Sequence, residues 1–202
     1  MYNKQVQSLD LAQLHSKMDP KSVKTYTPSY HNEDTVMESN MQYHRLGNTD
    51  MYLSYLGYGA SSLGSVFRAT DDEEAYDVVD LTLKGGVNYI DTAPWYGYRK
   101  SERVLGEAFK AKQIPREAYY IATKVGRYDP EPSKMFNFSY EKTLASVDES
   151  LRLLGLSYVD LIQVHDAEFA PSLDIVLKET LPALQKVKDD GKARYIGGYA
   201  FI

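Results

Sequence analysis

The stretch GVNYIDTAPWYGYRKSE, residues 86–102, decides the fold class of this chain. It begins with the short apolar run of a buried strand, and that run ends in Asp91. Tyr96 follows five positions later, after Pro94 and Trp95. Apolar runs of this length, bounded by glycine, are typical of strands in a parallel sheet. A buried strand that ends in a carboxylate, with a phenol one short loop away, needs a physical reason.

Strand and helix patterns alternate on both sides of this stretch. Thr70 and Glu73 fit a capping box at the start of one helix, Ser139 opens another that stops at Gly155, and Pro182 is expected to kink or split a later one. A hairpin is expected to turn near residues 47–50, followed by an apolar strand that ends at residues 57–59. Further strands are expected at 87–91, 118–124, 158–165 and 193–199, and helices from about 70, 101, 139 and 172.

The alternation predicts an α/β fold with parallel strands joined by right-handed crossovers. A doubly wound sheet would carry a glycine-rich phosphate loop after an early strand, and Gly57 and Gly59 do not complete that fingerprint. The competing architecture is a (β/α)8 TIM barrel, whose active site lies at the carboxyl ends of successive strands. The residues at the carboxyl ends of the predicted strands are therefore the candidates for an active site.

Four polar side chains fall at the predicted strand ends: Asp91, Lys124 and His165 end consecutive strands, and Tyr96 follows the first of them. Each residue alone is more often a loop, packing or solvated residue than a functional one. In a parallel sheet, however, all four would meet at one rim. Their joint placement is hard to attribute to four unrelated structural roles.

These four side chains share a chemical task. A tyrosine has an ordinary pKa of about 10, and a neighbouring ammonium such as that of Lys124 favours its phenolate. The carboxylate of Asp91 would keep that ammonium charged, and the imidazole of His165 would orient a carbonyl oxygen. The set suits carbonyl reduction or alcohol oxidation. Because no side chain carries a hydride, a nicotinamide cofactor is implied.

Composition excludes several other classes. The chain carries a net charge of −5 with no cluster of lysine and arginine, which argues against a nucleic-acid partner. It contains no cysteine, which excludes disulfides and thiolate chemistry, and no metal site is expected. No apolar run approaches the roughly 20 residues that span a bilayer, so we expect no membrane association and a cytoplasmic location.

Residues 43–197 resemble the aldo-keto reductase family. The resemblance rests on the stretches GVNYIDTAPWYGYRKSERVLGEAFK, YYIATKVGRY and SVDESLRLLGLSYVDLIQVHDAEF. Within the family, these local sequences are similar to the branch of L-galactose dehydrogenases and aldose 1-dehydrogenases. The resemblance implies NAD(P)-dependent oxidation of an aldose such as L-galactose to its lactone, or reduction of small carbonyls. By resemblance, Tyr96 is the general acid/base, Lys124 tunes it, Asp91 pairs with Lys124, and His165 orients the carbonyl.

The resemblance also implies a cofactor, NADP or NAD, without choosing between them. Gly59, Ala60 and Ser61, together with Asp91, are expected to contact this cofactor. Trp95 is expected to line the substrate site beside Tyr96 and His165. Asp166 is interpreted as a loop acid rather than a substrate contact.

Length sets the remaining expectations. A closed barrel of this kind takes about 250 residues, whereas residues 43–202 hold five predicted strands. We therefore expect a partial TIM barrel of about five of eight strands, truncated after the fifth, with residues 1–42 as a disordered extension. Such a domain is expected to be marginally stable and to bind dinucleotide weakly. The alternative is a catalytically inactive isoform that acts as an interaction or regulatory fragment.

Overall fold

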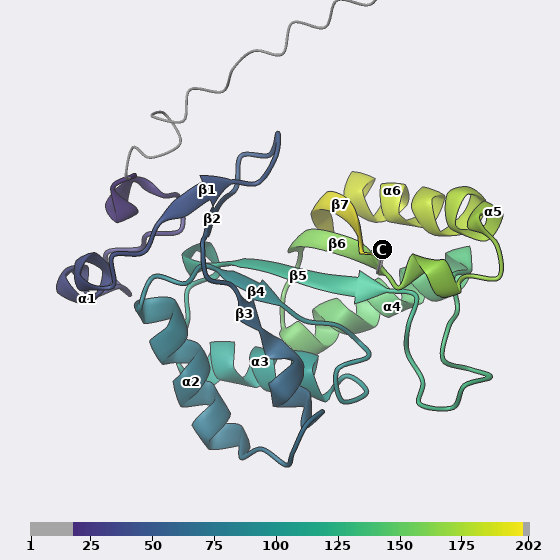
Figure 1. The fold of residues 1–202 in the computed structure, drawn as a ribbon, viewed down its shortest axis with the longest axis horizontal. Coiled ribbons are helices and arrows are strands. Elements are labelled where there is room, and N and C mark those ends of the chain that lie inside the picture. Colours follow the sequence, from purple (N-terminus) through teal and green to yellow (C-terminus); the bar gives the residue numbers. More distant parts are fainter. Residues whose placement is uncertain (1–17, 200–202) are drawn as a thin grey trace, which may run out of the picture.

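The structure, a computed structural model, describes residues 18–199 and contains a parallel sheet of five strands in chain order. The strands of the sheet are β3 (Tyr58–Gly59), β4 (Tyr89–Asp91), β5 (Tyr120–Val125), β6 (Val159–His165) and β7 (Ala193–Tyr199). Helices α2 (Asp72–Lys84), α3 (Lys100–Ala111) and α4 (Tyr140–Leu154) connect successive strands, and α5 (Leu173–Ile175) and α6 (Leu181–Asp189) precede β7 (Figure 1). The predicted α/β fold, a partial TIM barrel with a preceding hairpin, is confirmed.

The core lies between the sheet and the helices. Ile90, Ile121 and Ile162, on three adjacent strands, are fully buried. Leu105 of α3 and Leu154 of α4 belong to the same buried cluster. The strands are short and apolar because both faces of such a sheet are covered.

The helix termini follow local sequence chemistry, with one correction. Helix α2 is capped by Asp71, whose carboxylate accepts from the Glu74 amide at 2.9 Å, so the predicted cap at Thr70 is wrong. The Thr70 hydroxyl lies 3.0 Å from the Ser65 hydroxyl instead. Aspartate is a better capping residue than threonine, and the backbone enters the helix one residue later than the pattern indicated.

The other two predicted helix signals are confirmed. Ser139 caps α4 through its hydroxyl, and Gly155 ends the helix in a left-handed conformation. The chain before Pro182 forms a π-helical turn, Val176–Thr180, between α5 and α6. A proline removes one backbone donor from the helical ladder, which explains why the regular α-helix is interrupted at this point.

The N-terminal segment differs from the expected disordered extension. Within residues 18–42, helix α1 (Glu33–Glu38) buries Val36, and the preceding turn buries Val23. Tyr30 donates its hydroxyl to Asp80 of α2 at 2.9 Å. The expectation of disorder is therefore wrong for residues 18–42, because these few apolar side chains find partners on the body of the domain. Residues 1–17 lie outside the described residues, and the domain boundary at 42 stays a prediction.

The predicted hairpin consists of β1 (Tyr43–Arg45) and β2 (Tyr52–Ser54), paired antiparallel beside the amino ends of the strands (Figure 1). Asn88, just before β4, fixes it. The Asn88 side chain donates to the Tyr52 carbonyl oxygen at 2.8 Å and accepts from the Ser54 amide at 2.7 Å. Tyr43 donates its hydroxyl to the Gly86 carbonyl oxygen at 2.7 Å. These bonds hold the hairpin against the start of β4.

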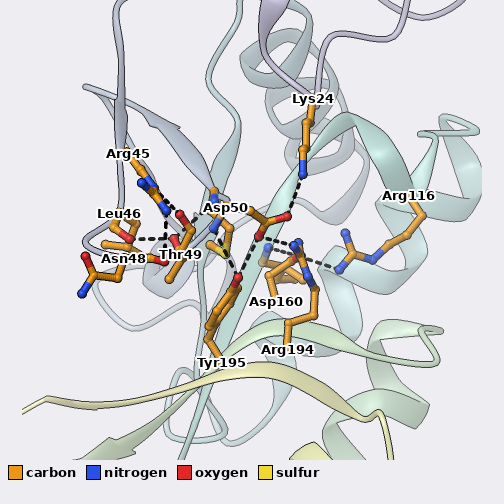
Figure 2. Close-up of polar contacts among 12 residues, drawn as sticks. Lys24, Arg45, Leu46, Asn48, Thr49, Asp50, Arg116, Asp160, Arg194 and Tyr195 are labelled. Atoms are coloured by element: carbon orange, nitrogen blue, oxygen red, sulfur yellow. Dashed lines mark hydrogen bonds and ion pairs between the residues drawn. The ribbon is translucent and has the colours of Figure 1, made fainter.

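An ionic network extends this attachment to the last strand (Figure 2). Asp50 of the hairpin turn accepts from Arg194 at 2.6 Å and from the Tyr195 hydroxyl at 2.8 Å. Arg194 also donates to Asp160 of β6 at 2.8 Å, and Arg116 donates to the same carboxylate at 2.6 Å. Asp160 is only 1% exposed. One buried carboxylate of β6 thus accepts from two guanidinium groups, Arg116 in the turn before β5 and Arg194 in β7.

We predict that Asp160→Asn lowers the free energy of unfolding by about 3 kcal/mol, because the two guanidinium groups lose a buried partner. The amide keeps the size of the side chain, so the loss reports on charge. Urea unfolding followed by far-ultraviolet circular dichroism measures it.

The matched control is Glu149→Gln. Glu149 pairs with Arg152 on the surface of α4, where the two side chains are 38% and 67% exposed. Exposed pairs contribute little to stability, so this variant should unfold like the wild type. Equal losses in the two variants would show that the Asp160 network carries no special weight.

Candidate active site

The carboxyl ends of β4, β5 and β6 bring the four predicted side chains together. Asp91 ends β4, Lys124 lies one residue before the end of β5, and His165 ends β6. The Lys124 ammonium forms an ion pair with Asp91 and donates to the Tyr96 hydroxyl at 3.1 Å. The Tyr96 and His165 rings meet edge to face, with centroids 6.0 Å apart.

The position of Lys124 is unusual because its residue is only 2% exposed. A buried ammonium is stable only when charges and dipoles replace its water. Asp91 supplies the charge, and the Thr92 carbonyl oxygen accepts a further hydrogen bond at 2.9 Å. The ammonium also lies 4.7 Å from the centre of the Tyr96 ring. It therefore stabilises negative charge on the phenol oxygen, the condition for proton exchange at that atom.

His165 is uncharged at neutral pH. Burial lowers the pKa of its imidazole to about 4, the Asp166 carboxylate opposes this shift, and the Lys124 ammonium adds to it. A neutral imidazole keeps one N–H donor. It is therefore suited to hydrogen-bonding a substrate oxygen without taking part as an acid.

Two glycines fix the loop that carries Tyr96. Gly97 has a positive φ of 64°, and a side-chain carbon there would overlap the carbonyl oxygen of Gly64. A carbon on Gly64 would likewise overlap the Tyr96 carbonyl. The 3-10 turn Ala60–Gly64 thus packs backbone to backbone against the loop. Sequence analysis did not single out these glycines, although the glycine directly after Tyr96 is a signal of such a close approach.

Buried polar side chains at the start of α3 also hold the Tyr96 loop and its neighbouring strands in place. Ser101 donates to the Ala60 carbonyl oxygen at 2.7 Å, and its hydroxyl lies 2.9 Å from that of Thr92. Glu102 is fully buried and accepts from the Thr123 hydroxyl at 2.7 Å. These contacts tie the turn after β3, the end of β4 and the middle of β5 into one unit. Their partners are distant in sequence, so the sequence pattern did not reveal them.

The residues predicted to contact a cofactor lie beside Asp91. Gly59 pairs with Asp91 in the register of β3 and β4. Gly59 is exposed, Ser61 is half-buried, and Ala60 is fully buried beneath them. A side-chain carbon on Gly59 would meet no atom within 4 Å. Gly59 and Ser61 are therefore accessible at the rim, whereas the Ala60 carbonyl is engaged by Ser101.

Trp95 and Asp166 flank the four central side chains. Trp95 is half-buried, and the guanidinium carbon of Arg127 lies 4.0 Å from its ring centre. Arg127 donates to Asp166 at 2.7 Å. Asp166 thus lies in an ion pair, and its interpretation as a loop acid rather than a substrate contact stays a prediction. Sequence analysis did not single out Arg127.

Comparison with known proteins identifies the family of this chain. Residues 55–198 match the model of the Aldo/keto reductase family. The chain belongs to the aldo/keto reductase family. L-Galactose dehydrogenase of Arabidopsis thaliana is 48% identical over 152 residues, which are 75% of this chain and 46% of that protein. D-threo-Aldose 1-dehydrogenase of a Pseudomonas species is 37% identical, over 70% of this chain and 48% of that protein.

Solved aldo-keto reductases share the fold. The holo form of aldo-keto reductase AKR11C1 from Bacillus halodurans superposes with a TM-score of 0.68 at 32% identity, covering 80% of this chain and 51% of that one. The chain thus spans about half the length of the family members it matches. These relatives are named as enzymes, and they do not favour the alternative of an interaction fragment.

No helix within residues 18–199 is long and apolar enough to cross a membrane. Nor does this part contain a group of three or more histidine, aspartate or glutamate side chains arranged to hold a metal ion.

We predict that Gly97→Ala destabilises the protein by clearly more than the about 1 kcal/mol that a left-handed backbone costs an ordinary residue. The added carbon must displace either Gly64 or the Tyr96 loop. Thermal unfolding and the rate of substrate turnover would both report the change.

Gly191→Ala separates the two causes of strain. Gly191 has a similar positive φ of 73°, but a side-chain carbon there would meet nothing within 4 Å. In this control the added carbon causes only the strain of the left-handed backbone, without a steric overlap. If both variants lost the same stability, the packing of Gly97 against Gly64 would carry no weight.

Proposed function

We propose that this aldo-keto reductase is an NAD(P)-dependent oxidoreductase that oxidises the anomeric carbon of an aldose such as L-galactose, giving the lactone, or reduces small carbonyls. One observation carries the proposal: the buried Lys124 ammonium touches both Asp91 and the Tyr96 hydroxyl. The names of the two aldose dehydrogenases among its relatives support the choice of substrate.

Tyr96 moves the proton in this proposal. During oxidation the phenolate form of Tyr96 takes the proton of the substrate hydroxyl and becomes the phenol, and the hydrogen on the same carbon leaves with its electron pair. Reduction runs the same steps backwards. Lys124 lies 3.1 Å from the Tyr96 oxygen and stabilises the negative charge of its phenolate form. Asp91 balances the ammonium, so the site does not carry an uncompensated buried charge.

His165 and Trp95 hold the substrate. The neutral imidazole donates its N–H to the oxygen that gains negative charge during reduction. Its ring stands edge to face with that of Tyr96, which supports a substrate oxygen placed beside both side chains. Trp95 provides an apolar wall for the sugar ring.

The residues present fit a nicotinamide cofactor. The four central side chains transfer a proton, whereas none of them carries a hydride. Gly59 leaves open space beside Asp91, and Ser61 continues that edge, so these three residues would hold the nicotinamide end. Ala60, which the sequence also suggested, is fully buried, and its carbonyl oxygen accepts from Ser101. When bound, the nicotinamide accepts or supplies the hydride. The choice between NAD and NADP stays open, and a cytoplasmic location stays a prediction from the sequence.

We predict that Tyr96→Phe lowers kcat at least about 100-fold, because the general acid/base is lost while the ring remains. The measurement is nicotinamide reduction with a panel of aldoses at the highest practical cofactor concentration. Tyr98→Phe is the matched control, since Tyr98 is 56% exposed on the same loop. Equal rates for Tyr96→Phe and wild type would remove Tyr96 from the mechanism.

Direct binding of the cofactor provides an independent test. Among residues 18–199, the proposed contacts come from two residues of one segment, Gly59 and Ser61, and from Asp91. We therefore expect fluorescence titration with NADH and NADPH to show weak binding. Strong quenching at low micromolar cofactor would mean that the chain holds the dinucleotide through further contacts.

A further inference from the structure

The loop after β6 contains a carboxylate that the proposed reaction does not use. Asp166 directly follows His165, is 3% exposed, and has a positive φ of 50°. A buried carboxylate and a left-handed backbone at a residue other than glycine are both unfavourable. Other contacts must compensate for them, and such strain is concentrated at functional sites.

Arg127 supplies the compensation from the loop after β5. Its guanidinium donates to the Asp166 carboxylate at 2.7 Å. The same guanidinium carbon lies 4.0 Å from the centre of the Trp95 ring and 5.5 Å from that of Phe136. The planar group therefore bridges residues from the loops after β4, β5 and β6. A planar cation of this kind stacks on aromatic rings while it donates in its own plane.

The ion pair also lies against His165. The second carboxylate oxygen of Asp166 is 3.7 Å from His165 Nε2, too far for a hydrogen bond, so it acts on the imidazole through its charge. The Tyr96 ring packs against the other side of the imidazole. The charged side chains that act on it are Asp166 and Glu168, which favour the imidazolium, and Lys124 and Arg127, which oppose it.

We propose that Arg127 is a positioning residue of the active site, which holds the Trp95 indole on one side and, through Asp166, the His165 loop on the other. The inference rests on the proposed function, because Trp95 and His165 are the two side chains assigned there to the substrate. A bridge between them fixes the width of the substrate site. An ion pair that only fastened two loops would not need to contact either of these residues.

The test uses the whole chain, because Trp95 is its only tryptophan. Arg127→Gln should shift Trp95 emission to the red and increase its quenching by acrylamide, since the indole loses the guanidinium that covers it. Asp166→Asn should change the emission in the same direction, because the guanidinium loses its anchor. Arg152→Gln is the matched control: Arg152 makes hydrogen bonds of 2.7 and 2.8 Å to Glu149 on the surface of α4 and should leave the emission unchanged.

The His165 titration distinguishes positioning from a loss of structure. The chain has four histidines, and the NMR ring signals of His165 are identified by their loss in His165→Gln. Arg127→Gln should raise the pKa of His165, and Asp166→Asn should lower it, because the two variants remove opposite charges. General loosening of the loop would instead hydrate the imidazole and raise its pKa in both variants, and that result would overturn the proposal.

Turnover adds a third readout. With an aldose at high cofactor, Arg127→Gln should lower kcat/KM roughly tenfold or more, with a raised KM. Arg127→Lys keeps the charge without the planar group and should restore the His165 titration but not the Trp95 emission. If the wild type had no activity, the proposed function would fail, and the two spectroscopic readouts would still decide the positioning role. Wild-type emission in both Arg127→Gln and Asp166→Asn would refute it.

Discussion

The burial of one ammonium group constrains the whole carboxyl end of this sheet. Lys124 emerges from the middle of the sheet with almost none of its surface exposed. A charged ammonium that is removed from water is stable only when a carboxylate and carbonyl oxygens contact it. Asp91 and the Thr92 carbonyl meet that requirement only while β4 and β5 keep their register. The Tyr96 phenol lies against the same ammonium, so strand pairing and the proposed proton transfer depend on one arrangement.

The two ends of the sheet are built for different purposes. At the amino end, the hairpin and the Asp160 network join the strands through ion pairs and hydrogen bonds. At the carboxyl end, the loops are held rigidly by Gly64 and Gly97 and by buried hydroxyl groups, while the side chains between them face an accessible rim. This division is the usual one in (β/α)8 barrels, where stability and function occupy opposite faces.

Much of this arrangement could be predicted from sequence, because it follows from short-range periodicity. Apolar runs located the strands, and the polar residue at the end of each run located Asp91, Lys124 and His165. The caps at Ser139 and Gly155 also depend on only a few neighbouring residues. The same local logic placed the cap of α2 one residue too early, because adjacent residues offered two capping side chains.

The sequence alone therefore determined the fold class, the family resemblance and the set of polar side chains that meet at the carboxyl rim. Tertiary structure decided what holds them: the order within residues 18–42, the contact of Gly64 with Gly97, and the bridge from Arg127 to Trp95 and Asp166. The physical reason is distance along the chain. Strand periods and caps involve residues within one or two turns of each other, whereas Arg127 and Asp166 are 39 positions apart and meet only because adjacent parallel strands end at the same rim.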